Sequence, residues 1–407
     1  MKGSMGTGKR PSLGDRLSES LWGLDSQELC ASAQRRTGLL DFGEPPLEPA
    51  LSTFVDSLER EADLHPIGRF LMRLHLLGLL ETRLRLAKAW QDLPQTLEAP
   101  FPQRPLFIVG MPRSGSTFLH ELLAEDPANR APRVWEVMFP VPPRTDAERE
   151  RRRRICKAEF CLWWFRRLAP EADSVYPLRA RTPHECVAIH SYTLLSEEFV
   201  STCRVPSYEK YLRAADLTPA YIWQKRFLQT LQFPGEPKRW ILKSPDHVHG
   251  LEELFSVFPD AMIIQTHRNP FQVLRSSAEL TRVLQSLYAR PSEAGQVVAR
   301  ETRLLADGTE RFLQFRDAHP ELACRFVDIK YSDLVAEPLT AIQHIYQRLG
   351  LPLSQTASAC MKLVASKRSR YRGVVNRLNP IHWGREAEAQ AQRFERYCSR
   401  FDLGLSQ

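Results

Sequence analysis

The stretch that decides the fold is LFIVGMPRSGSTFL, residues 106–119 of a chain of 407 residues. Its first four residues are apolar and predict a buried strand, and the residues from Ser116 onward open a helix. The glycine-rich turn between them presents bare backbone N–H groups to an anion, and the helix dipole adds favourable charge. Arg113 and three nearby hydroxyl groups add further donors. The sequence therefore predicts an anion-binding loop between a strand and a helix.

The loop nearly matches the Walker A pattern GxxxxGK[ST] of nucleoside triphosphate enzymes. Gly110, Gly115 and Thr117 are in place, but Ser116 stands where that pattern has lysine. The lysine reaches the outer phosphates of a triphosphate, so its absence argues against an ATPase or kinase. The basic side chain of this loop is Arg113, inside the turn.

Outward from this loop, the chain alternates short apolar runs with helical patterns. Further strands are predicted at 240–242, 261–266 and 324–329, and long helical inserts at 144–169 and 183–232. This order is typical of parallel α/β units with helices on both faces. The predicted fold is thus α/β, a P-loop-like three-layer arrangement with a central parallel sheet.

Helical segments are predicted on both sides of this core. Residues 1–100 form an N-terminal helical extension that packs on the core, and 101–350 form the α/β core itself. Residues 351–407 form a C-terminal helical and loop segment that completes the nucleotide site. Within the extension, two helices are expected between Leu51 and Trp90, the second starting at Pro66.

Two more cationic positions follow predicted strands. Arg268 comes directly after the strand at 261–266, Asn269 is suited to cap the next helix, and Pro270 suits its first turn. Ser276 lies almost two turns later and leans back toward the helix start, so a phosphate fits between it and Arg268. Lys243 ends the strand at 240–242. Because ligands of open α/β sheets bind at the carboxyl ends of strands, these cations and the loop favour a polyanionic ligand.

Composition limits the remaining classes. The chain carries a formal charge of +8 and a pI near 9.1, and its eight cysteines show no metal-ligand spacing. No run approaches the roughly 18 apolar residues of a membrane span, and the start of the chain lacks an apolar signal core. We therefore expect a cytoplasmic protein without a membrane span, a metal or a nucleic-acid partner. A non-catalytic anion-binding module stays an alternative, but it does not explain motifs that converge on strand ends.

Several motifs in order resemble those of sulfotransferases that use 3′-phosphoadenosine-5′-phosphosulfate (PAPS), above all the large, mainly bacterial branch with a PRSGTT-type loop. The resemblance covers roughly residues 100–350. It is carried by the loop at 110–119 and the pair Arg268 and Ser276, together with the segments 135–136, 141–143, 240–245 and 331–335.

The resemblance implies roles position by position. It places the 5′-phosphosulfate in the loop, the 3′-phosphate on Arg268 and Ser276, and Lys243 on the catalytic lysine of the cytosolic members. Phe118 takes the place of an adenine-stacking tryptophan. The implied donor-binding residues are Arg113, Ser114, Gly115, Ser116, Thr117, Phe118, Arg268, Ser276, Arg372 and Gly373. The implied activity is in-line transfer of a sulfuryl group from PAPS, the co-substrate, to an acceptor, without a metal. A hydroxyl acceptor is expected before an amine.

The general base is the open position, since Pro245 stands where cytosolic members have histidine. Glu136, in the Trp-Glu segment, ranks first and His247 second. Glu185, beside His184, is a third candidate in a segment expected to wall the acceptor pocket, and His120 is expected to pack or cap.

The acceptor is a small molecule, a lipid or a carbohydrate, and the sequence does not specify which. It also leaves the oligomeric state open. Two alternatives remain: a kinase-like enzyme that uses nucleoside triphosphates, and a family member that binds PAPS without activity.

Overall fold

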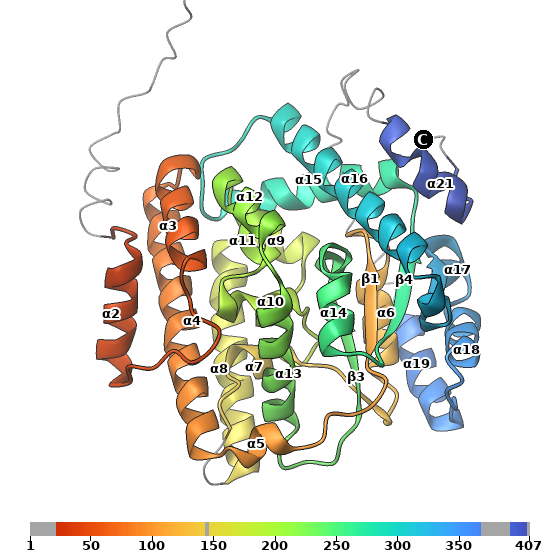
Figure 1. The fold of residues 1–407 in the computed structure, drawn as a ribbon, viewed down its shortest axis with the longest axis horizontal. Helices are drawn as coiled ribbons and strands as arrows, with labels where there is room; N and C mark the ends of the chain where they lie inside the picture. Colours follow the sequence, from red (N-terminus) through yellow and green to blue (C-terminus); the bar gives the residue numbers. More distant parts are fainter. Residues whose placement is uncertain (1–21, 143–145, 368–390, 405–407) are drawn as a thin grey trace, which may run out of the picture.

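A parallel sheet forms the centre of the molecule. The computed structural model describes residues 22–142, 146–367 and 391–404. In this part the sheet has five strands in the order β2-β3-β1-β4-β5, flanked by many helices (Figure 1). The strands are β1 (Leu106–Gly110), β2 (Asn129–Arg130), β3 (Arg239–Lys243), β4 (Met262–His267) and β5 (Phe326–Lys330). The predicted three-layer α/β fold is confirmed.

Two details of the sheet differ from the sequence prediction. The short strand β2 pairs with β3 through two residues, and no apolar run marks it in the sequence. The last strand begins at Phe326 rather than at 324, because Pro320–Arg325 form the 3₁₀ helix η3. Neither difference changes the order of the three strands that carry the predicted cations.

The central strand β1 explains why this sequence needs two helical layers. All five of its residues are buried. Leu106 and Ile108 enter an apolar cluster with α6, α18 and α19, whereas Phe107 and Val109 enter a larger cluster on the opposite face. Successive residues of a strand point to opposite faces, so an unbroken apolar run requires cover on both.

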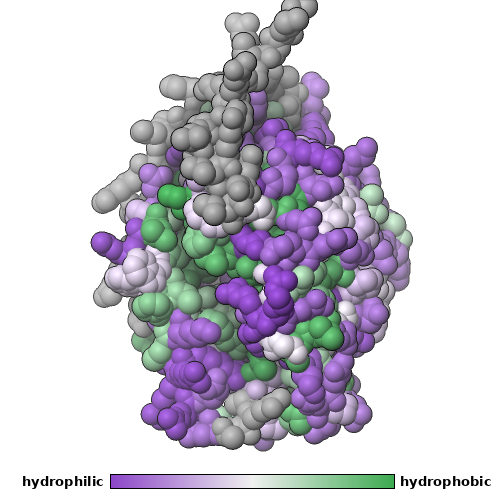
Figure 2. Space-filling model, turned by 90° about the vertical axis from the view of Figure 1, so that its left-hand side faces the viewer, coloured by the Kyte–Doolittle hydropathy of each residue, from purple (hydrophilic) through white to green (hydrophobic). Residues whose placement is uncertain are grey.

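The N-terminal helices belong to the larger cluster. They are α2 (Ser26–Thr37), α3 (Ala50–Glu61), α4 (Pro66–Asp92) and the short α5 (Gln95–Glu98). Helix α4 starts at Pro66, as predicted, and its buried leucines pack in the same cluster as Phe107. Figure 2 looks onto the α2 side of the molecule, where hydrophilic side chains surround smaller apolar areas. The division into 1–100, 101–350 and 351–407 stays a prediction.

The remaining helices connect and cover the strands. Before β3 they are α6 (Ser116–Leu123), α7 (Val134–Met138), α8 (Ala147–Leu168), α9 (Pro170–Val175), α10 (Val187–His190), η1 (Ser191–Thr193), α11 (Glu197–Thr202), α12 (Pro206–Ala214) and α13 (Thr218–Gln232). After β3 they are η2 (Pro245–His249), α14 (Leu251–Val257), α15 (Pro270–Ser286), α16 (Ala294–Ala318), α17 (Tyr331–Ala336), α18 (Pro338–Arg348), α19 (Gln355–Lys367), η6 (Ala391–Phe394) and α21 (Glu395–Phe401). Across the residues described, none of these helices has both the length and the apolar character needed to cross a membrane.

The topology positions the site. Strand β1 pairs with β3 on one side and β4 on the other, all three parallel. Their carboxyl ends therefore lie at the same edge of the sheet. The strands that follow β1 in the chain are added first on one side of it (β2 and β3) and then on the other (β4 and β5). Ligands of open α/β sheets bind at the edge where this change of side occurs. Lys243 and His267 are the last residues of β3 and β4, and the predicted anion loop follows β1.

Candidate active site

The loop between β1 and α6 has a tightly constrained backbone. Gly110 and Gly115 have positive φ angles of 135° and 89°, and Arg113 has the left-handed φ of 62° that non-glycine residues rarely adopt. A Cβ atom on Gly110 would lie 2.5 Å from the carbonyl oxygen of Thr266 on β4. Ser114 is fully buried, donates to the carbonyl of Met111 at 2.5 Å and contacts the Thr266 hydroxyl at 2.6 Å. The Ser114 side chain therefore holds the loop in shape.

Arg113 joins the loop to the second predicted phosphate site. Its Nε atom donates to Ser276 Oγ at 2.9 Å, and Arg268 donates to the Arg113 carbonyl at 2.7 Å. The Arg268 guanidinium lies 4.1 Å from the centre of the Tyr331 ring. Burial and the neighbouring Arg268 charge both lower the pKa of Arg113. Two partly desolvated guanidinium groups thus lie close together, an arrangement that an anion would stabilise.

The local structure behind this pair follows the sequence prediction. Asn269 caps α15 by accepting from the backbone N–H of Phe271 at 2.9 Å, and Pro270 occupies the first turn. Ser276 lies on the same helix, and its hydroxyl accepts from Arg113 Nε. The loop is therefore joined to α15 and to the residue that precedes its cap by two hydrogen bonds.

Lys243 lies on the other side of the loop and is almost completely buried. Its Nζ atom is 2.5 Å from Glu185 Oε1 and 3.4 Å from the Thr117 hydroxyl. Tyr176 donates to the same Glu185 oxygen at 3.0 Å. Burial alone would raise the pKa of Glu185, but Lys243 and the Tyr176 hydroxyl outweigh it and hold that pKa below its ordinary value. Glu185 is thus a carboxylate in direct contact with the predicted catalytic lysine.

Glu136, the first-ranked base in the sequence, has a different set of partners. One carboxylate oxygen accepts from Arg130 Nη2 at 2.9 Å, and the other accepts from the backbone N–H of Arg133 at 2.9 Å. The second bond caps the first turn of α7, whose N-cap residue is Arg133. Both oxygens of Glu136 are therefore occupied in holding a short helix and a neighbouring arginine.

The two histidines of the prediction are buried. His247 bonds through Nδ1 to the Tyr221 hydroxyl at 2.9 Å, and its Nε2 atom has no partner among the described residues. Burial, together with the nearby His190 and Lys243, places its pKa well below the ordinary value. His120 bonds to the Ile241 carbonyl, and burial lowers its pKa to about 4. Both rings are neutral near pH 7, and the packing role expected for His120 agrees with its position.

The remaining predicted donor residues fall into two groups. Ser116 is buried and Thr117 exposed in the first turn of α6, while Phe118 is partly buried against the cluster of Leu106 and Ile108. Arg372 and Gly373 lie outside the described residues.

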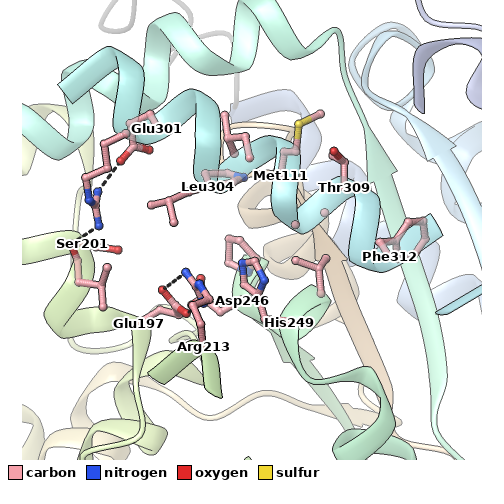
Figure 3. A pocket seen from close by; sticks show the side chains of 18 of the residues that line it. Met111, Glu197, Ser201, Arg213, Asp246, His249, Glu301, Leu304, Thr309 and Phe312 are labelled. Atoms are coloured by element: carbon pink, nitrogen blue, oxygen red, sulfur yellow. Dashed lines mark hydrogen bonds and ion pairs between the residues drawn. The ribbon is translucent and has the colours of Figure 1, made fainter. Parts of the chain in front are cut away.

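A cavity of about 80 Å³ with a mixed apolar and polar lining adjoins the loop (Figure 3). Gly110, Met111 and Pro112 line one side, and η2 and α16 line the others. Two ion pairs border it, Glu197 with Arg213 and Arg300 with Glu301. Gln265 Oε1 and His249 Nδ1, on residues that line the cavity, have no hydrogen-bond partner among the described residues.

Asp246 lines this cavity from η2 and was not singled out from the sequence. Its Oδ2 atom accepts from the Ser244 hydroxyl at 2.9 Å. Burial first and the Glu197 charge second raise its pKa to about 7. The sequence feature that could have pointed to Asp246 is its position three residues after Lys243, just past a predicted strand end. Tyr176 was missed as well, and Tyr331 was noted only as part of the segment 331–335 without a role, because the partners of both residues are remote in sequence.

The comparisons with known proteins agree with this geometry. Residues 105–355 match the model of the sulfotransferase family. A relative named omega-hydroxy-beta-dihydromenaquinone-9 sulfotransferase Stf3, from Mycobacterium bovis, is 27% identical over 287 residues, which is 64% of this chain and 67% of the relative.

Two solved structures are similar over most of the chain. Sulfotransferase STF1 of Mycobacterium tuberculosis is 30% identical with a TM-score of 0.77, covering 86% of this chain and 98% of its own. Sulfotransferase STF9 of Mycobacterium avium is 27% identical with a TM-score of 0.77, covering 94% and 97%. The family match spans more than half of the chain, on the residues that build the loop, the sheet edge and both cationic positions. The chain belongs to the sulfotransferase family.

Proposed function

We propose that this protein transfers a sulfuryl group from PAPS to a hydroxyl acceptor. The observation that carries the proposal is the link between two anion sites, in which Arg113 reaches Ser276 and Arg268 holds the Arg113 carbonyl. PAPS carries a phosphosulfate and a separate 3′-phosphate, so it needs two such sites at a fixed separation. Phe118, at the start of α6, is the proposed stacking partner of adenine.

The proposed chemistry relies on positioning and charge. Backbone N–H groups of the loop, the N-terminus of α6 and the Thr117 hydroxyl would hold the phosphosulfate. Arg113 within the loop and Lys243 at the end of β3 would stabilise negative charge on the sulfuryl group and the leaving phosphate. The positions of these groups require no covalent enzyme intermediate.

For the general base, the geometry favours Glu185. Its carboxylate contacts Lys243 and is ionised near pH 7, since its pKa lies below the ordinary value. Glu136 has both oxygens bonded to Arg130 and Arg133, and His247 is buried among aromatic rings. We therefore propose Glu185 as the residue that accepts the acceptor proton. Glu136 and His247 are the alternative candidates for the general base.

For the acceptor we propose a chemical class and not a single compound. The mycobacterial relative is named for an omega-hydroxy-dihydromenaquinone, so a hydroxyl on a lipid-like molecule is a candidate, beside carbohydrate and small-molecule hydroxyls. We also propose a cytoplasmic location. The eight cysteines are all free thiols in the structure, which suits a reducing compartment.

The test is a thermal-shift titration with adenosine 3′,5′-bisphosphate, set beside ATP with Mg²⁺ and 5′-AMP. A ligand that binds only the folded state raises the melting temperature. We expect a shift with the bisphosphate that is lost in R113A and R268A. The charge-matched variant R60A, which removes an exposed arginine of α3, should keep it.

Each other outcome has a definite meaning. A shift with ATP and Mg²⁺ alone would replace the proposal with an enzyme that uses nucleoside triphosphates. A bisphosphate shift without PAPS turnover across an acceptor panel would favour an inactive PAPS-binding member.

A further inference from the structure

Helix α8 carries an unusual outer surface. Four of its large apolar side chains are exposed, namely Phe160 (62%), Trp163 (47%), Trp164 (48%) and Leu168 (66%). Single exposed apolar residues are ordinary, but four within nine residues form a contiguous apolar end on one helix. Trp163 and Trp164 lie 4.9 Å apart between ring centres, and Phe160 and Trp164 lie 6.4 Å apart. We call this set of four residues the aromatic end of α8.

The opposite side of α8 is already used for packing. Ile155, Ala158 and Leu162 are buried in an apolar cluster with Val134 and Ala180. At about 100° per residue, the buried Leu162 and the exposed Trp164 lie roughly 160° apart around the helix axis. The aromatic end therefore points away from the buried cluster beneath α8.

The same helix is strongly cationic. Residues 147–168 contain eight arginine and lysine residues against three glutamates, a net charge of +5. The cations are Arg149, Arg151, Arg152, Arg153, Arg154, Lys157, Arg166 and Arg167. Glu148 and Glu150 form ion pairs with arginines in the first turns of α8. These two carboxylates therefore already have cationic partners on the same helix. Whatever covers α8 must accept aromatic side chains and a high density of positive charge together.

This combination decides between possible occupants. A second copy of the chain would bring another +5 helix against the first, which is unfavourable at short range. An anionic lipid surface satisfies both requirements, because arginine and lysine attract lipid phosphates and tryptophan prefers the interface between headgroups and acyl chains. We propose that α8 docks this protein on an anionic membrane surface through its aromatic end and its flanking cations.

The packing of α8 connects such docking to the active site. Glu159 accepts from the backbone N–H of Ala180 at 2.9 Å, and α8 packs on α7 and α9. The segment that contains Ala180 continues to Glu185, which contacts Lys243. A docked α8 would thus hold the acceptor side of the site close to the lipid headgroups. The proposal itself does not depend on the identity of the sulfuryl donor.

The experiment measures binding of the full chain to vesicles of phosphatidylcholine alone and of phosphatidylcholine with 30% phosphatidylglycerol, by co-sedimentation at low and high salt. We expect binding to the anionic vesicles only, weakened by salt. The double variant W163S/W164S should bind on the order of tenfold more weakly, because it removes interfacial apolar area. The matched control L40S/I67S removes two other exposed apolar side chains and should bind like the wild type.

Three results would overturn the proposal. They are equal sedimentation with both vesicle types, unchanged binding of W163S/W164S, and a concentration-dependent dimer in light scattering that the double variant abolishes. Quenching of wild-type tryptophan fluorescence by brominated lipids gives a second measurement that needs no variant. Absence of quenching in sedimenting samples would likewise exclude insertion of the aromatic end.

Discussion

At the scale of single residues, the catalytic assignment depends on two glutamates with opposite surroundings. Glu185 contacts Lys243, whereas Glu136 caps α7 and pairs with Arg130. The variant E185Q should keep its affinity for adenosine 3′,5′-bisphosphate within a few fold but lose about 10²–10⁴-fold in turnover. Turnover of radiolabelled PAPS with an identified acceptor, and calorimetric affinity for the bisphosphate, measure the two effects separately.

The matched variant is E136Q. Loss of its two charge-assisted bonds should lower the free energy of unfolding by about 1–3 kcal/mol while turnover of the folded fraction stays near wild type. The reverse pattern, with turnover lost in E136Q and retained in E185Q, would return the base to Glu136.

Asp246 gives a prediction about pH. Its carboxyl titrates near pH 7 in the folded chain, because burial and Glu197 outweigh the Ser244 hydroxyl and Arg213, which favour the charged form. In the unfolded chain an aspartate titrates near pH 4. Between these values the folded state binds the extra proton, so the contribution of Asp246 to stability falls as the pH rises through this window.

The variant D246N removes that dependence. At pH 8 it should be more stable than the wild type by about 1–3 kcal/mol, and the difference should shrink toward zero near pH 4. Urea unfolding at several pH values measures it. A wild type that is the more stable form at pH 8 would mean that a cation neutralises Asp246 in the folded state.

At the scale of elements, the strand, loop and helix formed by β1, residues 111–115 and α6 depend on close backbone approach. Gly110 pairs with Thr266 across β1 and β4, and an added Cβ would meet two Thr266 oxygens at 2.5 and 2.6 Å. G110A should lower the free energy of unfolding by about 2–3 kcal/mol, because backbone has to move and the φ of 135° is unfavourable for alanine.

The control for G110A is G78A on α4. Gly78 is exposed, and its added Cβ would meet nothing within 4 Å. Alanine there should raise the free energy of unfolding by about 0.5–1 kcal/mol, because it suits a helix interior better than glycine. Urea unfolding measures both variants. A G110A protein as stable as the wild type would show that the loop tolerates a wider turn than the structure has.

The elements also show what the sequence predicted and why. The strands at β1, β3 and β4, the cap at Asn269 and the helix start at Pro66 follow from local patterns, and all were confirmed. Contacts between distant segments could not be predicted in that way. Glu185 reaches Lys243 across 58 residues of sequence, and Tyr331 lies under Arg268 across 63. Such pairs depend on how inserts fold back over the sheet, which periodicity does not encode.

At the scale of the whole molecule, the end of the described chain returns to the sheet edge that carries the site. Helix α21 packs beside β4, where the Tyr397 hydroxyl bonds His267 at 2.8 Å and the Phe401 ring lies 3.8 Å from the His267 ring. Tyr397 also lines the cavity beside the loop. Arg268 directly follows His267. The C-terminal segment thus supports the residue that precedes the proposed 3′-phosphate site.

Removal of residues 391–407 should therefore affect stability and donor binding together. Phe394, Tyr397 and Cys398 are buried, so their loss should lower the free energy of unfolding by roughly 3–5 kcal/mol or more. We expect a bisphosphate dissociation constant at least about tenfold higher, because His267, which precedes Arg268, loses its contacts with Tyr397 and Phe401 and both linked anion sites loosen. R393Q is the matched control, since it breaks only the exposed pair with Asp307 and should cost less than about 1 kcal/mol. Calorimetry at a temperature where the truncated chain is still folded separates the two effects. Wild-type affinity in that folded, truncated chain would limit α21 to a structural role and leave the donor site to the loop and α15.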